Sequence, residues 1–288
     1  MTQSDDRSPN CTHILNATDQ SFQQDVIDAS SEQLILVDCW ASWCEPCKSL
    51  MPTLEELAYH YDGDFTLVKI NTEIAPATAQ TLGVTTLPTV FAIYDGVVMD
   101  QFQGLLEKND IIQWIENLMS QIVFNKALAN ESDDPSGSER VYRELCAKRD
   151  NPDPVRIALA RVSTSLGRHE EAFEIIDALE RERGYLEPEA QQVKALIELV
   201  RPNHDLDELR NQAIQHPDDL EFKLQLAQGL AANQEYEESF AIALELVKQD
   251  KSSTGDSAKE FLLGAFMALD DESDLVHHTR RKLAMLMY

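Results

Sequence analysis

The chain has 288 residues, enough for two ordinary domains, and 43% of them are hydrophobic, so a sizeable core can be buried. The formal net charge is −27 at pH 7, which argues against binding to nucleic acid or anionic membranes, because both need basic patches. The start, MTQSDDRSPN, lacks the basic and apolar regions of a signal peptide, and no stretch approaches the roughly 20 apolar residues of a membrane span. We therefore expect a soluble, cytoplasmic protein whose partners are recognised through apolar or basic contacts.

Strand and helix patterns alternate in the first 120 residues. They predict, in chain order, a strand at 34–43, a helix at 47–61, a strand at 65–70, a helix at 75–82 and a helix from Asn109 to 119. Before the last helix, two apolar segments around the turn Asp95-Gly96 predict a hairpin over 89–94 and 97–102. Strands interleaved with helices predict an α/β domain over residues 1–120.

Residues 121–288 lose the strand pattern and show apolar residues at helical spacing almost to the end. The segment ESDDPSGS (131–138) is typical of a linker or loop. We therefore expect a second, all-α domain over residues 121–288.

The helical half repeats itself. Segment 159–179 matches segment 226–246, and the small residue Ala172 falls on Ser239. The offset is close to twice the period of roughly 34 residues that is typical of tetratricopeptide repeats (TPR). Small residues at such positions let antiparallel helices approach closely. The pattern predicts a TPR-like stack of three or four helical hairpins; an irregular helical bundle with one chance match is the alternative.

Two cysteines, Cys44 and Cys47, follow the first predicted strand and open the next helix. Their spacing allows a reversible disulfide, and the free N–H groups and dipole of a helix N-terminus stabilise a thiolate on the first sulfur. We expect Cys44 to be the nucleophile and Cys47 the resolving thiol. Such a pair could also be half a zinc site, but the other two ligands have no matching motif, so we expect no metal and no cofactor.

Residues 34–104 resemble thioredoxin. The resemblance is carried by Asp38-Cys39-Trp40-Ala41, Trp43-Cys44-Glu45-Pro46-Cys47-Lys48, Pro52, Lys69, Leu87-Pro88-Thr89, Gly96 and Gly104. It implies that Asp38 is a buried proton acceptor for Cys47 and that Lys69 tunes Asp38. It also implies that Pro88 is cis and borders the substrate groove, and it counts Trp43 among the site residues. From the residues alone, Asp38 could instead cap a loop.

Two residues depart from the thioredoxin pattern. Glu45 replaces a glycine between the cysteines, and a carboxylate there disfavours a neighbouring thiolate, so the sequence predicts a Cys44 less acidic than in thioredoxin. Cys39 replaces a phenylalanine and is expected to be a small buried hydrophobe. We expect Cys11 and Cys146 to be incidental.

Along its whole length the chain resembles the bacterial chaperedoxins (the YbbN/CnoX type), in which degenerate TPR units follow a thioredoxin domain. That resemblance implies a holdase that binds unfolding client proteins under oxidative or bleach stress. It also implies transfer of those clients to the GroEL chaperonin or to the DnaK system. Some members of the family lack the cysteine pair, whereas this sequence retains it.

The last segment, 273–288, has the pattern of an amphipathic helix with added positive charge. It could cap the helical stack, or it could dock on the chaperonin, as the resemblance implies. The expected docking residues are apolar: Leu275, Val276, Leu283, Leu286 and Met287. His277 and His278 are expected to be solvated rather than metal ligands.

The sequence therefore favours a redox-active co-chaperone that holds unfolded clients and protects or reduces their cysteines by mixed-disulfide exchange. The alternative is a dedicated protein disulfide reductase that thioredoxin reductase recharges, with a TPR domain that selects substrates. A third possibility is an adaptor whose redox site is vestigial.

Overall fold

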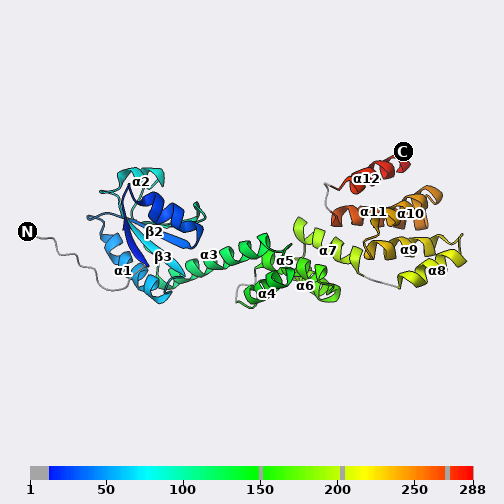
Figure 1. Cartoon of the computed structure of the whole chain (residues 1–288), viewed down its shortest axis with the longest axis horizontal. Coiled ribbons are helices and arrows are strands. Elements are labelled where there is room, and N and C mark those ends of the chain that lie inside the picture. The colour runs from blue at the N-terminus through cyan, green and yellow to red at the C-terminus, as the bar shows by residue number, and fades with distance from the viewer. Residues whose placement is uncertain (1–12, 149–151, 202–204, 270–272, 288) are drawn as a thin grey trace, which may run out of the picture. The chain divides into compact units, whose positions relative to one another are not determined.

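The computed structural model describes residues 13–148, 152–201, 205–269 and 273–287. The chain divides into two compact units, Met1–Ile122 and Val123–Tyr288. Figure 1 shows a sheet with helices in the first unit and helices in the second. In the described part of the chain, no helix has the length and apolar character that a membrane span requires.

The first unit is built on a five-stranded sheet with the order β1-β3-β2-β4-β5. Its strands are β1 (Ile14–Ala17), β2 (Leu34–Trp40), β3 (Phe65–Asn71), β4 (Thr89–Tyr94) and β5 (Val97–Gln103). β3 is parallel to both β1 and β2, whereas β4 is antiparallel to both β2 and β5. β2 is the middle strand and is buried along nearly its whole length, which explains its continuous apolar run.

Helices cover both faces of this sheet. They are η1 (Gln23–Asp28), η2 (Ala29–Ser31), α1 (Glu45–His60), α2 (Pro76–Thr81) and α3 (Lys108–Ala129). Leu34 and Leu36 of β2 pack in one core with the apolar residues of α1 and α3. Ile35 and Val37 face the other way, into a core with η1 and the region of α2. The sheet thus forms the middle layer of an α/β unit.

The expected strands, hairpin and helices of this unit are present, and the differences lie at its edges. β1 and the helical segment 23–31 were not predicted, because a four-residue edge strand gives too short a pattern. The last helix runs from Lys108 to Ala129, well past the expected end at 119.

The second unit is all helical where it is described. Its helices after α3 are α4 (Pro135–Cys146), α5 (Asp153–Ser165), α6 (His169–Arg183), α7 (Pro188–Val200), α8 (Leu206–Gln215), α9 (Leu220–Ala232), α10 (Tyr236–Gln249), α11 (Ser253–Ala268) and α12 (Asp274–Met287). The expected loop at 131–138 is wrong in its second half, because α4 begins at Pro135. The Asp134 side chain accepts a hydrogen bond from the Gly137 N–H and so caps this helix.

The two matching segments fold alike. Segment 159–179 lies in the pair α5–α6, and segment 226–246 lies in the pair α9–α10; both pairs pack tightly. Ala172 and Ser239 are completely buried, and the Ser239 hydroxyl donates to the Ala227 carbonyl of the facing helix at 2.6 Å. The small residues therefore sit where two helices meet, as the repeat predicts.

The stack is irregular in its middle. α7 packs mainly on α5, α6 and α11, whereas α8 packs on α9. The two helices between the matching segments, α7 and α8, therefore do not form a close hairpin of their own. This arrangement places α7, α9 and α11 side by side.

Candidate functional site

Cys44 and Cys47 form a disulfide at the N-terminus of α1, with their Cα atoms 5.3 Å apart. Cys44 is the N-cap residue of the helix, and its Sγ accepts a hydrogen bond from the Cys47 backbone N–H at 3.2 Å. Pro46 lies in the first turn, where its missing N–H costs no hydrogen bond. A thiolate at Cys44 would therefore be stabilised by a backbone N–H and by the helix dipole.

The two sulfur-bearing residues differ in access. Cys44 is 3% exposed and Cys47 is completely buried. Ala41 shares their small apolar cluster, and Trp40 and Leu87 pack against it. Of these two residues, Cys44 alone keeps a small exposed surface.

Asp38 is a buried carboxyl group in the middle of β2. Neither of its oxygens has a hydrogen-bond partner among the described residues. Burial raises the pKa of Asp38 to about 7, although the positive charge of Lys69 opposes this rise and the negative charge of Glu55 adds to it. A carboxyl with this pKa can both accept and release a proton near neutral pH.

Lys69 lies opposite Asp38 in the register of β2 and β3. Its ammonium group pairs with Glu55 of α1, with Nζ 2.7 Å from Oε1. Lys69 therefore acts on Asp38 through space while its direct partner is a second carboxylate. Glu55 was not among the predicted site residues, although it lies eight residues after Cys47 in α1 and so shares a helix face with it.

Trp43 directly precedes Cys44 in the sequence, and Pro88 follows Leu87, which packs against the cysteine cluster. The Trp43 side chain is largely exposed, at 67%. The Leu87–Pro88 peptide bond is cis, and Leu87 packs against the cysteine cluster. The site thus offers an exposed aromatic ring on one segment and a proline loop on another.

Ser42 and Glu73, which were not predicted as site residues, stabilise the turn before Cys44. The backbone N–H and the hydroxyl of Ser42 both donate to the Glu73 carboxylate, at 2.9 and 2.6 Å. Thr72 adds two hydrogen bonds to the Trp40 carbonyl. Glu73 lies two residues after the end of β3. Residues just after parallel strands gather at one edge of a sheet, and this is the signal that could have indicated Glu73.

Glu45 lies between the two cysteines and forms an ion pair with Lys48. The Lys48 ammonium group is 2.6 Å from the Glu45 carboxylate, and both side chains are exposed. The ion pair reduces the negative charge that Cys44 experiences, and solvent screens what remains.

Cys39 and Cys146 are free thiols in the described part of the chain. Cys39 is completely buried in the core, and burial, with a smaller contribution from Asp38, raises the pKa of its thiol to about 12. Cys146 lies in α4, half-buried, and burial raises its pKa as well. Cys11 falls outside the described residues. Within the described ranges, no three His, Cys, Asp or Glu side chains gather as a metal site would require.

The expected docking residues of the C-terminal helix divide between core and surface. Val276 and Leu283 are buried in the main core of the helical unit, and Leu275 and Leu286 pack against that core. These four residues pack α12 onto the stack, Val276 and Leu283 as buried residues and Leu275 and Leu286 as partly buried ones. Met287 is exposed, as is Met285, which the sequence did not single out.

Comparison with known proteins agrees with these features. Residues 13–117 match the thioredoxin family model, and residues 199–288 match a tetratricopeptide repeat model. Thioredoxin 2 of Chlorobaculum tepidum is 42% identical over 102 residues, which are 35% of this chain and 92% of that protein. The thioredoxin of Pseudomonas aeruginosa is 38% identical over 104 residues, which are 36% of this chain and 94% of that protein. Through residues 13–117, the chain therefore belongs to the thioredoxin family.

Proposed function

We propose that this protein is a redox-active co-chaperone that exchanges disulfides with the client proteins held by its helical unit. The observation that carries the proposal is the Cys44 sulfur at the N-terminus of α1, bonded to the Cys47 N–H, in a chain that also has TPR helices. The first feature provides thiol chemistry, and TPR stacks bind protein segments.

In the exchange reaction, the reduced Cys44 thiolate attacks one sulfur of a client disulfide. A Cys44–client disulfide forms, and the other client sulfur leaves as a thiolate. Cys47 then gives its proton to Asp38, and its thiolate attacks the Cys44 sulfur. The Cys44–Cys47 disulfide forms, and the second client sulfur leaves as a thiolate. Two electrons thus pass from the dithiol to the client, and thioredoxin reductase with NADPH would restore them.

The helical unit would hold the client while this exchange takes place. The resemblance to chaperedoxins adds that held clients pass to the GroEL chaperonin or to the DnaK system. Because Val276 and Leu283 are core residues, docking through α12 would use its exposed residues, Met285 and Met287.

A dedicated disulfide reductase is the second candidate. It is favoured by the thioredoxin relatives, of which more than nine-tenths of the length matches this chain. In this case, the helical unit selects substrates and has no holding function of its own.

Insulin reduction with NADPH and thioredoxin reductase tests the redox activity. Cys44→Ser should abolish turnover because it removes the nucleophile, and Cys47→Ser should trap a mixed disulfide. Cys146→Ser changes a cysteine of α4 and should leave turnover unchanged. A Cys44→Ser protein that reduces insulin at the wild-type rate would contradict the proposal.

Suppression of citrate synthase aggregation distinguishes the two candidates. The co-chaperone proposal predicts suppression by the wild-type chain, also when both cysteines are serine. A chain that reduces insulin but leaves aggregation unchanged would favour the dedicated reductase.

Chaperonin pull-down with Met285→Lys/Met287→Lys tests docking through α12, and undiminished capture would rule out this surface.

A further inference from the structure

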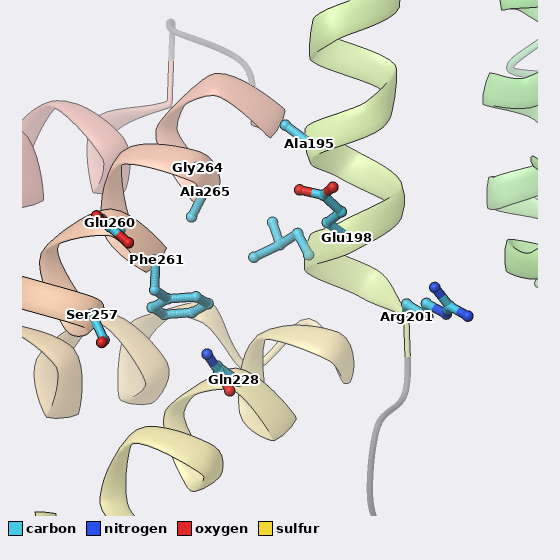
Figure 2. A pocket seen from close by; sticks show the side chains of 10 residues that line it. Ala195, Glu198, Arg201, Gln228, Ser257, Glu260, Phe261, Gly264 and Ala265 are labelled. Carbon is cyan, nitrogen blue, oxygen red and sulfur yellow. The ribbon is translucent and has the colours of Figure 1, made fainter. Parts of the chain in front are cut away.

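A groove of about 340 Å³ lies in the helical unit between α7, α9 and α11. Figure 2 shows Glu198 on α7, Arg201 directly after this helix, Gln228 on α9, and Glu260, Phe261 and Gly264 on α11. The ring of Phe261 projects into the space between the three helices. Its apolar walls include Leu199 and Ala265, which are buried in the main core of the unit.

The charge of this groove is negative. Glu198 and Glu260 are exposed, and neither has an ion-pair partner among the described residues. Arg201 is the basic residue in the lining, but it is already engaged. Two of its nitrogens donate to the Glu170 carboxylate, at 2.9 and 2.6 Å, and its guanidinium lies 5.3 Å from the Phe173 ring. Figure 2 shows the Arg201 side chain pointing away from Phe261.

Gly264 keeps one wall of the groove open. At the other helical glycines of the described chain, Gly137, Gly229 and Gly255, an added Cβ would come closer than 3.0 Å to another atom. At Gly264 an added Cβ would meet nothing within 4 Å. A glycine inside a helix costs about 1 kcal/mol relative to alanine, and here packing does not account for that cost. The missing side chain instead leaves space in the groove.

We propose that this groove binds arginine or lysine side chains of an extended protein segment. Glu198 and Glu260 would hold the cationic head, and Phe261 would contact both the cation and its apolar stem. Long basic side chains combine the two properties that the lining matches, an apolar stem and a positive head. The net charge of −27 would also attract basic segments from a distance.

This inference rests on the proposed function only for the role of the helical unit in binding proteins. The probe is a short fluorescent peptide that carries two arginines among serine, alanine and leucine. The reference peptide has citrulline in place of both arginines, which keeps the length and removes the charge. Fluorescence anisotropy with the full-length protein measures both affinities.

The variant Glu198→Gln/Glu260→Gln should weaken binding of the arginine peptide about tenfold and leave the citrulline peptide nearly unchanged. The control Glu144→Gln/Glu174→Gln removes two exposed carboxylates of α4 and α6 and so changes the net charge equally. It should bind the arginine peptide like the wild type. Affinity should also fall as salt rises.

The variant Gly264→Leu fills the groove without a backbone clash. It should weaken the arginine peptide at least as much as the double glutamine variant, while the better helix propensity of leucine keeps the melting temperature at or above that of the wild type. Equal affinity of the wild type for the arginine and citrulline peptides would overturn the proposal. Wild-type affinity in Gly264→Leu would also overturn it.

The citrate synthase assay keeps this inference separate from the proposed function. If the wild type suppresses aggregation but does not bind the arginine peptide, the groove proposal fails and the co-chaperone proposal stands. If it binds the peptide through Glu198 and Glu260 but does not suppress aggregation, the groove proposal stands and the co-chaperone proposal fails.

Discussion

Burial removes the Asp38 carboxyl from water, and its neighbours do not fully compensate for the lost solvation. Its carboxyl is completely buried, lacks hydrogen-bond partners among the described residues, and has a pKa of about 7 instead of 3.8. Between these two values the folded protein binds more protons than the unfolded chain does. The free energy of unfolding should therefore fall as pH rises from about 4 to 7 and then level off. The site keeps a poorly solvated acid at a cost in stability, which is typical of functional residues.

The variant Asp38→Asn should raise the free energy of unfolding of the oxidised first unit by roughly 4 kcal/mol at pH 8. The gain should nearly disappear near pH 3, where Asp38 is largely protonated in both the folded and the unfolded state. Urea unfolding followed by tryptophan fluorescence measures this, since all three tryptophans, Trp40, Trp43 and Trp114, lie in the first unit. Asp64→Asn, at an exposed position, is the control. A gain that does not vary with pH would contradict this explanation.

Glu45 and Lys48 make opposite contributions to the reactivity of Cys44. Glu45→Gln should raise the rate of alkylation of the reduced protein by iodoacetamide at pH 7 about twofold, because a nearby negative charge is removed. Lys48→Gln should lower that rate by a similar factor, because Glu45 is then unpaired. Both differences should shrink at high salt, since the pair is exposed. Equal alkylation rates in the wild type and both variants would show that neither charge affects the reactivity of the Cys44 sulfur.

Among the secondary-structure elements, the contact between α9 and α10 shows how the repeat is held. Ser239 is completely buried and donates to the Ala227 carbonyl, and Ser138 of α4 donates in the same way to Ala127 of α3. A small side chain brings the helices close, and its hydroxyl gives a buried carbonyl a second partner. Ala172 keeps the small size without the hydroxyl.

Ser239→Ala should lower the stability of the helical unit by about 1 kcal/mol, through the lost hydrogen bond. Ser239→Leu should lower it by about 3 kcal/mol or more, because the two helices are forced apart. Thermal unfolding followed by circular dichroism at 222 nm measures both effects. Ser257→Ala, at an exposed position in α11, should change little. A leucine variant as stable as the alanine variant would show that close packing at this site is unimportant.

The same elements show what the sequence could predict. The buried strands, the hairpin and the cysteine-bearing helix follow from local patterns, and the repeat locates α5–α6 and α9–α10. The start of α4 was not predicted because Pro-Ser-Gly-Ser has a loop-like composition. The hydrogen bond from Ser138 to the Ala127 carbonyl joins this segment to another helix, and a local sequence pattern does not indicate such a contact. The partners Glu55 and Glu73 were missed for the same reason. Their contacts, to Lys69 and Ser42, join segments that are 14 and 31 residues apart.

At the scale of the whole molecule, the disulfide and the TPR helices lie in different units. The disulfide links residues only three apart in the sequence, so it restricts the unfolded chain modestly. Reduction should lower the stability of the first unit by about 2 kcal/mol. Tryptophan fluorescence during urea unfolding, with and without reductant, measures this change. The Cys44→Ser/Cys47→Ser protein should not respond to reductant, and a response of equal size there would refute the explanation.

α3 begins in one unit and ends in the other. Ile111, Ile115, Leu118 and Ile122 belong to the core against the sheet, whereas Phe124 and Ala127 belong to a core of the helical unit. A cut at the 122/123 boundary would leave the second fragment with only the last seven residues of this helix, too few to remain helical without support. Protein engineers who exchange either unit should therefore treat residues 108–129 as a shared part and carry the whole helix in both halves.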